Sequence, residues 1–109
     1  DLSSKNYIGF FQDVELVAVM DLVDVYPKQE IAYIGLFMVD MRWQGQNIGS
    51  AIIREVENYL KKVGIQSFRL AINKGNPQST HFWTKNGYIV IREVNKDGKG
   101  SLLEAEKVL

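Results

Sequence analysis

The chain has 109 residues, 46% hydrophobic and 24% charged, with 13 basic and 13 acidic side chains and therefore no net charge. This length and balance fit one globular domain, and they exclude a disordered chain and a generally basic nucleic-acid binder. The lack of cysteine and the single histidine, His81, exclude a thiol nucleophile, a thiolate zinc site and a two-histidine metal site within one chain.

No apolar run reaches the roughly 18 residues that a membrane-spanning helix needs, so we expect no membrane partner. We also expect no metal and no nucleic-acid partner. A chain without cysteine suits a reducing compartment, so the expected location is cytoplasmic.

The N-terminal third predicts three strands. Residues 6–11 and 15–25 are rich in branched and aromatic types, and polar residues at Gln12 and Asp13 separate them, which predicts a hairpin. Residues 31–39 form a nearly continuous apolar run, which predicts a central strand covered on both faces. Gly35 inside this run predicts a bend or a bulge.

Residues 48–63 predict the clearest helix, because apolar residues recur at spacings of three and four and Gly64 follows as a stop signal. Glu57 stands four residues before Lys61, which predicts an exposed ion pair. The apolar stripe of this helix is expected to contain Ile48, Ile52, Ile53, Val56, Tyr59, Leu60 and Val63.

The C-terminal part predicts a second, shorter helix between strands. Asn76 followed by Pro77 is typical of a helix cap and first turn, and this helix is expected to end at Asn86 and Gly87. The remaining strands are expected at residues 67–72, 88–94 and 102–108.

This order of elements predicts an α+β fold, with a mixed, mostly antiparallel central sheet flanked by helices. We expect one domain over residues 1–109. The chain begins at Asp1 without Met, and its first residues already predict a strand. One expectation is that the natural protein starts earlier; a complete domain is the alternative.

The junction after the third strand reads Val39-Asp-Met-Arg-Trp-Gln-Gly-Gln-Asn-Ile-Gly-Ser50. Backbone N–H groups without helical partners, together with the helix dipole, form a site for phosphate oxygens at such a junction. Gly45 and Gly49 allow close approach of a ligand because they lack a Cβ. A glycine-containing turn that simply enters a helix explains the pattern equally well. The spacing matches neither a P-loop nor the three-glycine dinucleotide fingerprint.

Residues 44–49 resemble the acetyl-CoA signature of the GNAT N-acetyltransferases, Gln/Arg-x-x-Gly-x-Gly/Ala. Gln44 and Gly49 match, and the usual glycine at the fourth position is Asn47, a residue that tolerates a left-handed backbone. Residues 76–88 resemble the family's later motif, in which Asn precedes a helix ending in Phe-Tyr-x-Lys-x-Gly-Phe/Tyr. Together the motifs place the core of the resemblance at residues 7–94.

The resemblance implies an acyltransferase that passes an acetyl group from acetyl-CoA directly to an amine, without a covalent enzyme intermediate. The strand 31–39 would diverge from its neighbour, so that backbone groups near Phe37 and Val39 pair with the pantetheine arm. The Val39 N–H would polarise the thioester carbonyl, and Asn76 would reach the pantetheine or the neighbouring strand. The residues implied to bind pyrophosphate are Gln44, Gly45, Gln46, Asn47, Ile48, Gly49 and Ser50.

Two departures from the family stand out. Trp83 takes the place of a tyrosine that protonates the leaving thiolate in many members, so it is expected to line the cofactor site without donating a proton. The strand and two helices with which the family begins, which normally help to form the acceptor pocket, are not found after Asp1.

The general base and the acceptor each have more than one candidate. Glu30 is our candidate base, with Asp21 and Asp24 as other candidates by location, although each fits a solvated surface charge as well. The acceptor is a small-molecule amine or a peptide or protein amine. A non-catalytic CoA-binding or interaction module is the alternative function. A homodimer formed through an exposed sheet edge is a further hypothesis.

Four other residues have open interpretations. Tyr33 either lines the acceptor site or packs in the fold, and Arg42 either contacts a CoA phosphate or stays solvated. His81 is expected on an exposed helix face, and Trp43 is expected against the sheet.

Overall fold

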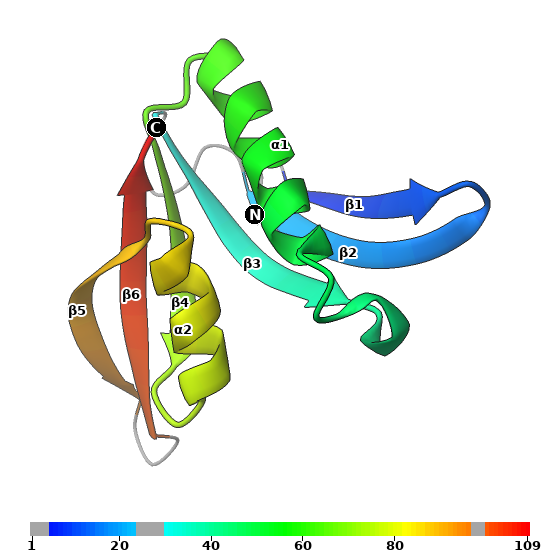
Figure 1. Cartoon of the computed structure of the whole chain (residues 1–109). Helices are drawn as coiled ribbons and strands as arrows, with labels where there is room; N and C mark the ends of the chain where they lie inside the picture. The colour runs from blue at the N-terminus through cyan, green and yellow to red at the C-terminus, as the bar shows by residue number, and fades with distance from the viewer. Residues whose placement is uncertain (1–4, 24–29, 97–99) are drawn as a thin grey trace.

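The computed structural model describes residues 5–23, 30–96 and 100–109. One six-stranded sheet has the strand order β1-β2-β3-β4-β6-β5, and the two α-helices follow the third and fourth strands (Figure 1). Only β3 and β4 pair in parallel, and the other neighbouring pairs are antiparallel. The predicted mixed, mostly antiparallel α+β fold is therefore confirmed.

The first three strands form an antiparallel meander of β1 (Lys5–Gln12), β2 (Glu15–Val23) and β3 (Ile31–Val39). Asp13 takes the left-handed backbone conformation in the turn between β1 and β2, with a φ of 56°. Asp is one of the few residues besides Gly that adopt this conformation readily, which explains a tight turn without glycine.

A bulge at Gly35 interrupts the pairing of β3 with β2. Asp21 lies opposite Leu36 and Leu22 opposite Ile34, so Gly35 is the extra residue. A Cβ on Gly35 would lie 3.1 Å from Asp21 Oδ2, which explains why glycine occupies the bulge. The predicted irregularity at Gly35 is confirmed.

β3 and β4 (Ser67–Asn73) pair only from Ile31 opposite Ser67 to Ile34 opposite Leu70, after which the two strands diverge. The prediction that β3 is covered on both faces is correct only for its first half. Ile31, Ala32 and Ile34 are buried, whereas Leu36 and Met38 are 42% and 58% exposed. These exposed residues lie beyond Ile34, the last residue of β3 that pairs with β4.

Helix α1 (Ile48–Lys62) packs on the sheet through Ile52, Ile53, Val56 and Leu60, which are all buried. The prediction is wrong for two residues of the apolar stripe, since Tyr59 and Val63 are 61% and 57% exposed. They lie at the edge of the stripe and near the end of the helix, where the sheet no longer covers them.

The predicted exposed pair of Glu57 and Lys61 is also wrong. Glu57 is buried, and its carboxylate accepts hydrogen bonds from Lys107 Nζ at 2.9 Å and from the Tyr88 hydroxyl at 2.7 Å. These distant partners surround the carboxylate because Glu57 lies on the face of α1 that packs against the rest of the protein.

The C-terminal half contains β4, the short helix α2 (Pro77–Lys85) and the strands β5 (Ile89–Lys96) and β6 (Gly100–Val108). β6 lies between β4 and β5, so the last strand is internal and β5 is an edge. The side chains of Phe68, Leu70 and Ile72 alternate toward the core from β4 and are all buried, as predicted.

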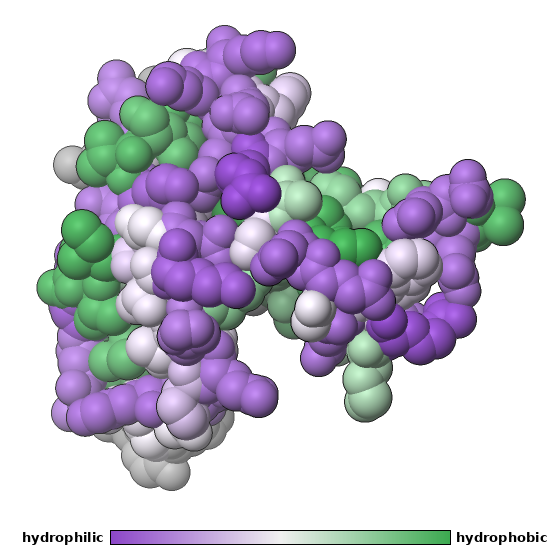
Figure 2. Space-filling view, viewed as in Figure 1, coloured by the Kyte–Doolittle hydropathy of each residue, from purple (hydrophilic) through white to green (hydrophobic). Residues whose placement is uncertain are grey.

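Edge strand β5 carries apolar side chains that remain in contact with solvent, and Figure 2 shows apolar surface on this side of the molecule. Ile89 is 68% exposed, while Val90, Ile91 and Val94 are between 38% and 41% exposed. Among the described residues, no helix is long and apolar enough to cross a membrane.

Candidate functional site

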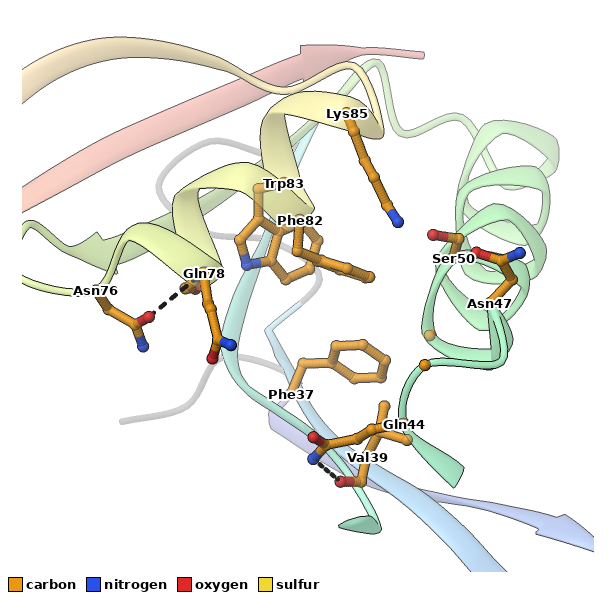
Figure 3. A pocket seen from close by; sticks show the side chains of 13 residues that line it. Phe37, Val39, Gln44, Asn47, Ser50, Asn76, Gln78, Phe82, Trp83 and Lys85 are labelled. Atoms are coloured by element: carbon orange, nitrogen blue, oxygen red, sulfur yellow. Dashed lines mark hydrogen bonds between the residues drawn. The ribbon is translucent and has the colours of Figure 1, made fainter. Parts of the chain in front are cut away.

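A cavity of about 460 Å³ lies where β3 and β4 diverge. Its walls come from the end of β3, the loop before α1, the first turn of α1 and the inner face of α2 (Figure 3). In the space-filling view it opens into the hollow between the two halves of the molecule (Figure 2). The lining residues are Phe37, Val39, Gln44, Gly45, Asn47, Gly49, Ser50, Asn76, Gln78, Ser79, Phe82, Trp83 and Lys85.

The open edge of β3 faces this cavity. The Asp40 N–H donates to the Val17 carbonyl on β2 at 2.7 Å. Because backbone groups alternate between the two edges of a strand, the N–H and carbonyl of Val39 point away from β2, toward the side that β4 has left. The Val39 carbonyl accepts from Gln44 Nε2 at 2.9 Å, which links the strand end to the loop (Figure 3).

The loop between β3 and α1 holds a left-handed turn. Gly45 and Asn47 have positive φ values of 80° and 61°. No atom lies within 4 Å of a Cβ built on Gly45, so its glycine is explained by backbone conformation rather than by crowding within the chain. Asn47 keeps the left-handed conformation that the sequence predicted for it.

The N-terminus of α1 is open to a ligand. Its first helical hydrogen bond runs from the Ala51 N–H to the Asn47 carbonyl, so the N–H groups of Ile48, Gly49 and Ser50 have no helical partner. Asn47 occupies the N-cap position but makes no side-chain capping hydrogen bond. Three donors and the positive end of the helix dipole therefore remain available for an anion.

The N-terminus of α2 shows the opposite arrangement, although an asparagine precedes it too. Asn76 Oδ1 accepts from the Ser79 N–H at 3.1 Å and closes the first turn, which confirms the predicted cap. This end is therefore partly satisfied by its own cap, whereas no side chain caps the α1 end.

Gly49 brings the two helices into contact. A Cβ at this position would lie 3.1 Å from Cε1 of Phe82 and 3.6 Å from Cγ2 of Val39. A separation of 3.1 Å is closer than ordinary carbon contacts, so any larger residue would push the Phe82 ring out of its place. The glycine thus sets the width of the cavity.

Aromatic side chains form the apolar wall of the cavity. Phe82 and Trp83 pack edge to face with ring centroids 4.9 Å apart, and Phe37 lies 6.1 Å from Trp83. Trp83 is only 6% exposed and also packs on Tyr88. The wall fits an apolar, extended ligand, and it joins β3 to α2 across the point where the strands diverge.

Among the lining residues that the structure describes, Lys85 has the only ionisable side chain. It comes from the last turn of α2, and its ammonium is directed across the cavity toward Ser50 and Asn47 (Figure 3). Lys85 was not predicted as a site residue from the sequence, and neither were the lining residues Gln78, Ser79 and Phe82. Their presence in the motif 76–88 was the available signal.

Most of the predicted cofactor residues meet in this cavity. Gln46 and Ile48 do not line it; Gln46 turns its side chain back to the Arg42 carbonyl at 3.3 Å, and Ile48 packs against the core. Their backbone groups still belong to the loop and first turn.

The structure does not bring the candidate base Glu30 to the cavity. Glu30 is exposed at the start of β3, whereas Phe37 is about 23 Å further along an extended strand at roughly 3.3 Å per residue. Asp21 is buried against Gly35, beside the point where β3 leaves β4. Asp24 lies outside the described residues.

Arg42 does not line the cavity either. It donates to Asp40 and pairs with Glu15 at 2.6 Å, and its hydrogen bonds hold the pKa of the Asp40 carboxyl below its ordinary value. His81 is exposed, and Trp43 packs against the core, as expected for both.

A family model described as the acetyltransferase (GNAT) family matches residues 1–88. The chain is 28% identical over 98 residues to a protein of Thermoplasma acidophilum named spermidine N(1)-acetyltransferase, covering 90% of this chain and 57% of that protein. The chain thus spans little more than half the length of this relative.

Solved structures show the same fold. An acetyltransferase from Thermus thermophilus matches with a TM-score of 0.81 at 24% identity, over 100% of this chain and 66% of that one. The PaiA N-acetyltransferase from Thermoplasma acidophilum, solved in complex with coenzyme A, matches with a TM-score of 0.78 at 26% identity, over 96% and 61%.

Proposed function

Because the chain belongs to the GNAT acetyltransferase family, we propose that its cavity binds acetyl-CoA and that the protein transfers the acetyl group to an amine. One observation carries the proposal: an uncapped helix N-terminus and the open edge of β3 face the same cavity. The first suits phosphate oxygens and the second suits the amide groups of a pantetheine arm.

The pyrophosphate would lie on the N–H groups at the start of α1, where Gly45 and Asn47 shape the loop. Among the described residues that line the cavity, Lys85 supplies the only positive side chain, and it would neutralise part of the phosphate charge. The pantetheine arm would run along the open half of β3 past Phe37, with Trp83 and Phe82 as its apolar wall.

The Val39 N–H points to this open edge, so it would donate to the thioester carbonyl and stabilise the negative charge that develops there. In the reaction the amine nitrogen attacks the carbonyl carbon, the C–N bond forms and the C–S bond breaks. The electron pair leaves with the CoA sulfur, and the ammonium proton must be removed before the attack.

The acceptor we would test first is a polyamine. The support is the relative of Thermoplasma acidophilum that is named for spermidine, at 28% identity. Asp21 is the better placed of the two described carboxylates considered as the base, because it is buried beside the divergence of β3 and β4.

A second function, binding of CoA without catalysis, is favoured by one observation. The described residues that line the cavity include no carboxylate and no imidazole, and Trp83 has no hydroxyl to protonate the leaving thiolate. A binding module needs only the phosphate loop and the apolar wall.

Calorimetric titration of the chain with acetyl-CoA, followed by measurement of thiol release with spermidine and a panel of primary amines, tests both functions. Binding with thiol release supports the transferase, and binding without release by any amine supports the binding module. Absence of binding at millimolar acetyl-CoA would contradict both. Gly49→Leu serves as a matched control, because its side chain would displace Phe82 and should abolish binding.

A further inference from the structure

Asn86 connects the two helices that enclose the cavity. It follows α2 as the C-cap, and its side-chain nitrogen Nδ2 lies 2.8 Å from the Phe82 carbonyl and 3.1 Å from Ser50 Oγ in α1. One amide group therefore contacts the end of α2 and the first turn of α1 at the same time.

The orientation of this amide is fixed by chemistry. The Phe82 carbonyl can only accept a hydrogen bond, so the group that faces it must be the NH₂ of Asn86 and not its oxygen. The second N–H of the same NH₂ group then reaches Ser50 Oγ, and the serine oxygen must act as the acceptor.

This arrangement restricts the direction in which the Ser50 hydroxyl can donate its hydrogen. Since its oxygen accepts from Asn86, the hydroxyl hydrogen must turn elsewhere, and within the described part of the chain it donates to no acceptor. Thr80 and Thr84 in α2 differ, because each donates its hydroxyl to a helix carbonyl, at 3.2 Å and 2.9 Å. Ser50 is only 6% exposed and lines the cavity at the first turn of α1, so the cavity is the side on which an acceptor for this proton can lie.

The backbone of Asn86 is also held in place by a hydrogen bond. Its backbone carbonyl accepts from Lys107 Nζ at 2.9 Å, and Lys107 forms an ion pair with buried Glu57 of α1, also at 2.9 Å. The Tyr88 hydroxyl binds the other oxygen of the same carboxylate. Both the main chain and the side chain of Asn86 are thus fixed relative to α1.

We propose that Asn86 is a positioning residue that orients the Ser50 hydroxyl as a fourth donor to a CoA phosphate, beside the three N–H groups of α1. This inference rests on the proposed binding of CoA. The hydroxyl acts on the ligand directly, whereas Asn86 acts only through the hydroxyl.

A double-mutant cycle tests the coupling. Coenzyme A is titrated into the 109-residue chain and into Ser50→Ala, Asn86→Ala and the double variant, and thermal unfolding of each protein is recorded. Ser50→Ala should weaken CoA binding roughly ten-fold, as expected for a lost hydrogen bond to a charged group. Asn86→Ala should weaken it about three- to ten-fold when Ser50 is present, and not measurably in the Ser50→Ala background.

Equal effects of Asn86→Ala in both backgrounds would overturn the proposal, since a purely structural role does not depend on the hydroxyl. If Asn86→Ala does not fold, the nearly isosteric Asn86→Asp replaces it. Its carboxylate accepts the Ser50 proton, so its effect must be larger when Ser50 is present than in the Ser50→Ala background of the same cycle. If the parent chain does not bind CoA, the proposed function fails as well, whereas binding with an additive cycle refutes only the role of Asn86.

Discussion

The Tyr88 hydroxyl donates to Glu57 Oε2 over 2.7 Å, which joins the residue before β5 to the middle of α1 inside the protein. Burial and the neighbouring carboxylate raise the pKa of Tyr88 above its ordinary value. The neutral phenol is therefore favoured in the folded state, and the buried carboxylate depends on it for one of its hydrogen bonds.

Tyr88→Phe should destabilise the fold by about 1–3 kcal/mol at pH 8, because it leaves a buried acceptor without its donor. The folded-state pKa lies above the unfolded value of 10.0, so this contribution is full below pH 10 and declines as the pH rises above it. The difference between the two proteins should then shrink, as urea unfolding at pH 8 and pH 10.5 would measure. Tyr59→Phe, at a 61% exposed position, is the control; a difference for Tyr88→Phe no larger than this control would refute the prediction.

Substitutions of Asn47 test the shape of the loop between β3 and α1. Its φ of 61° suits glycine, so Asn47→Gly should retain CoA affinity within about two-fold, whereas Asn47→Ala should lose about 1–2 kcal/mol of stability through left-handed strain. CoA titration and thermal unfolding measure the two effects. Asn58→Ala, the same change at an exposed position of α1, should affect neither. If Asn47→Ala were as stable as the parent chain, the loop would not need the left-handed conformation.

Lys85 should contribute to affinity through charge. Lys85→Ala is expected to weaken CoA binding roughly ten-fold at low salt and less at 0.5 M salt, because ions screen a partly exposed contact. Titrations at both salt concentrations measure the difference. Lys61→Ala removes an exposed lysine from the far end of α1 and should leave the affinity unchanged. Equal affinities for Lys85→Ala and the parent chain would place the phosphates elsewhere.

Substitutions of the two candidate bases, Asp21 and Glu30, should have different effects on turnover. Asp21→Asn should lower kcat by about a hundred-fold or more with little change in CoA affinity if Asp21 removes the amine proton. Glu30→Gln changes an exposed side chain at the other end of β3 and should leave kcat unaltered. Steady-state kinetics with an amine that supports turnover measures kcat for both variants. If Glu30→Gln lowered kcat and Asp21→Asn did not, Glu30 would be the base.

The order and type of the elements could be predicted from the sequence, because local signals specify them. Asn76 and Pro77 determine where α2 starts, and the stripe through Ile53, Val56 and Leu60 determines which face of α1 is buried. The loop before α1 could also be predicted from a local signal, because Gly and Asn, here Gly45 and Asn47, are the residues that favour a left-handed backbone.

Contacts between distant segments were not predictable in the same way. The spacing of Glu57 and Lys61 on one helix suggested a pair, but Tyr88 and Lys107 reach that carboxylate only after the sheet has formed. Glu57 shares the helical stripe with Ile53 and Leu60, and this periodicity was the signal against an exposed pair. Likewise, nothing local shows that Lys85 turns into the cavity, because that depends on how α2 packs.

The position of β6 between β4 and β5 has a consequence for the order of folding. The β1–β2–β3 meander and the β5–β6 hairpin pair neighbours in sequence and can form early, whereas the pairing of β4 with β6 joins segments separated by α2 and β5 and should form later. Lys107, which holds the carbonyl of Asn86, also comes from β6. We therefore expect the α1 side of the cavity to form first and the α2 side to close last.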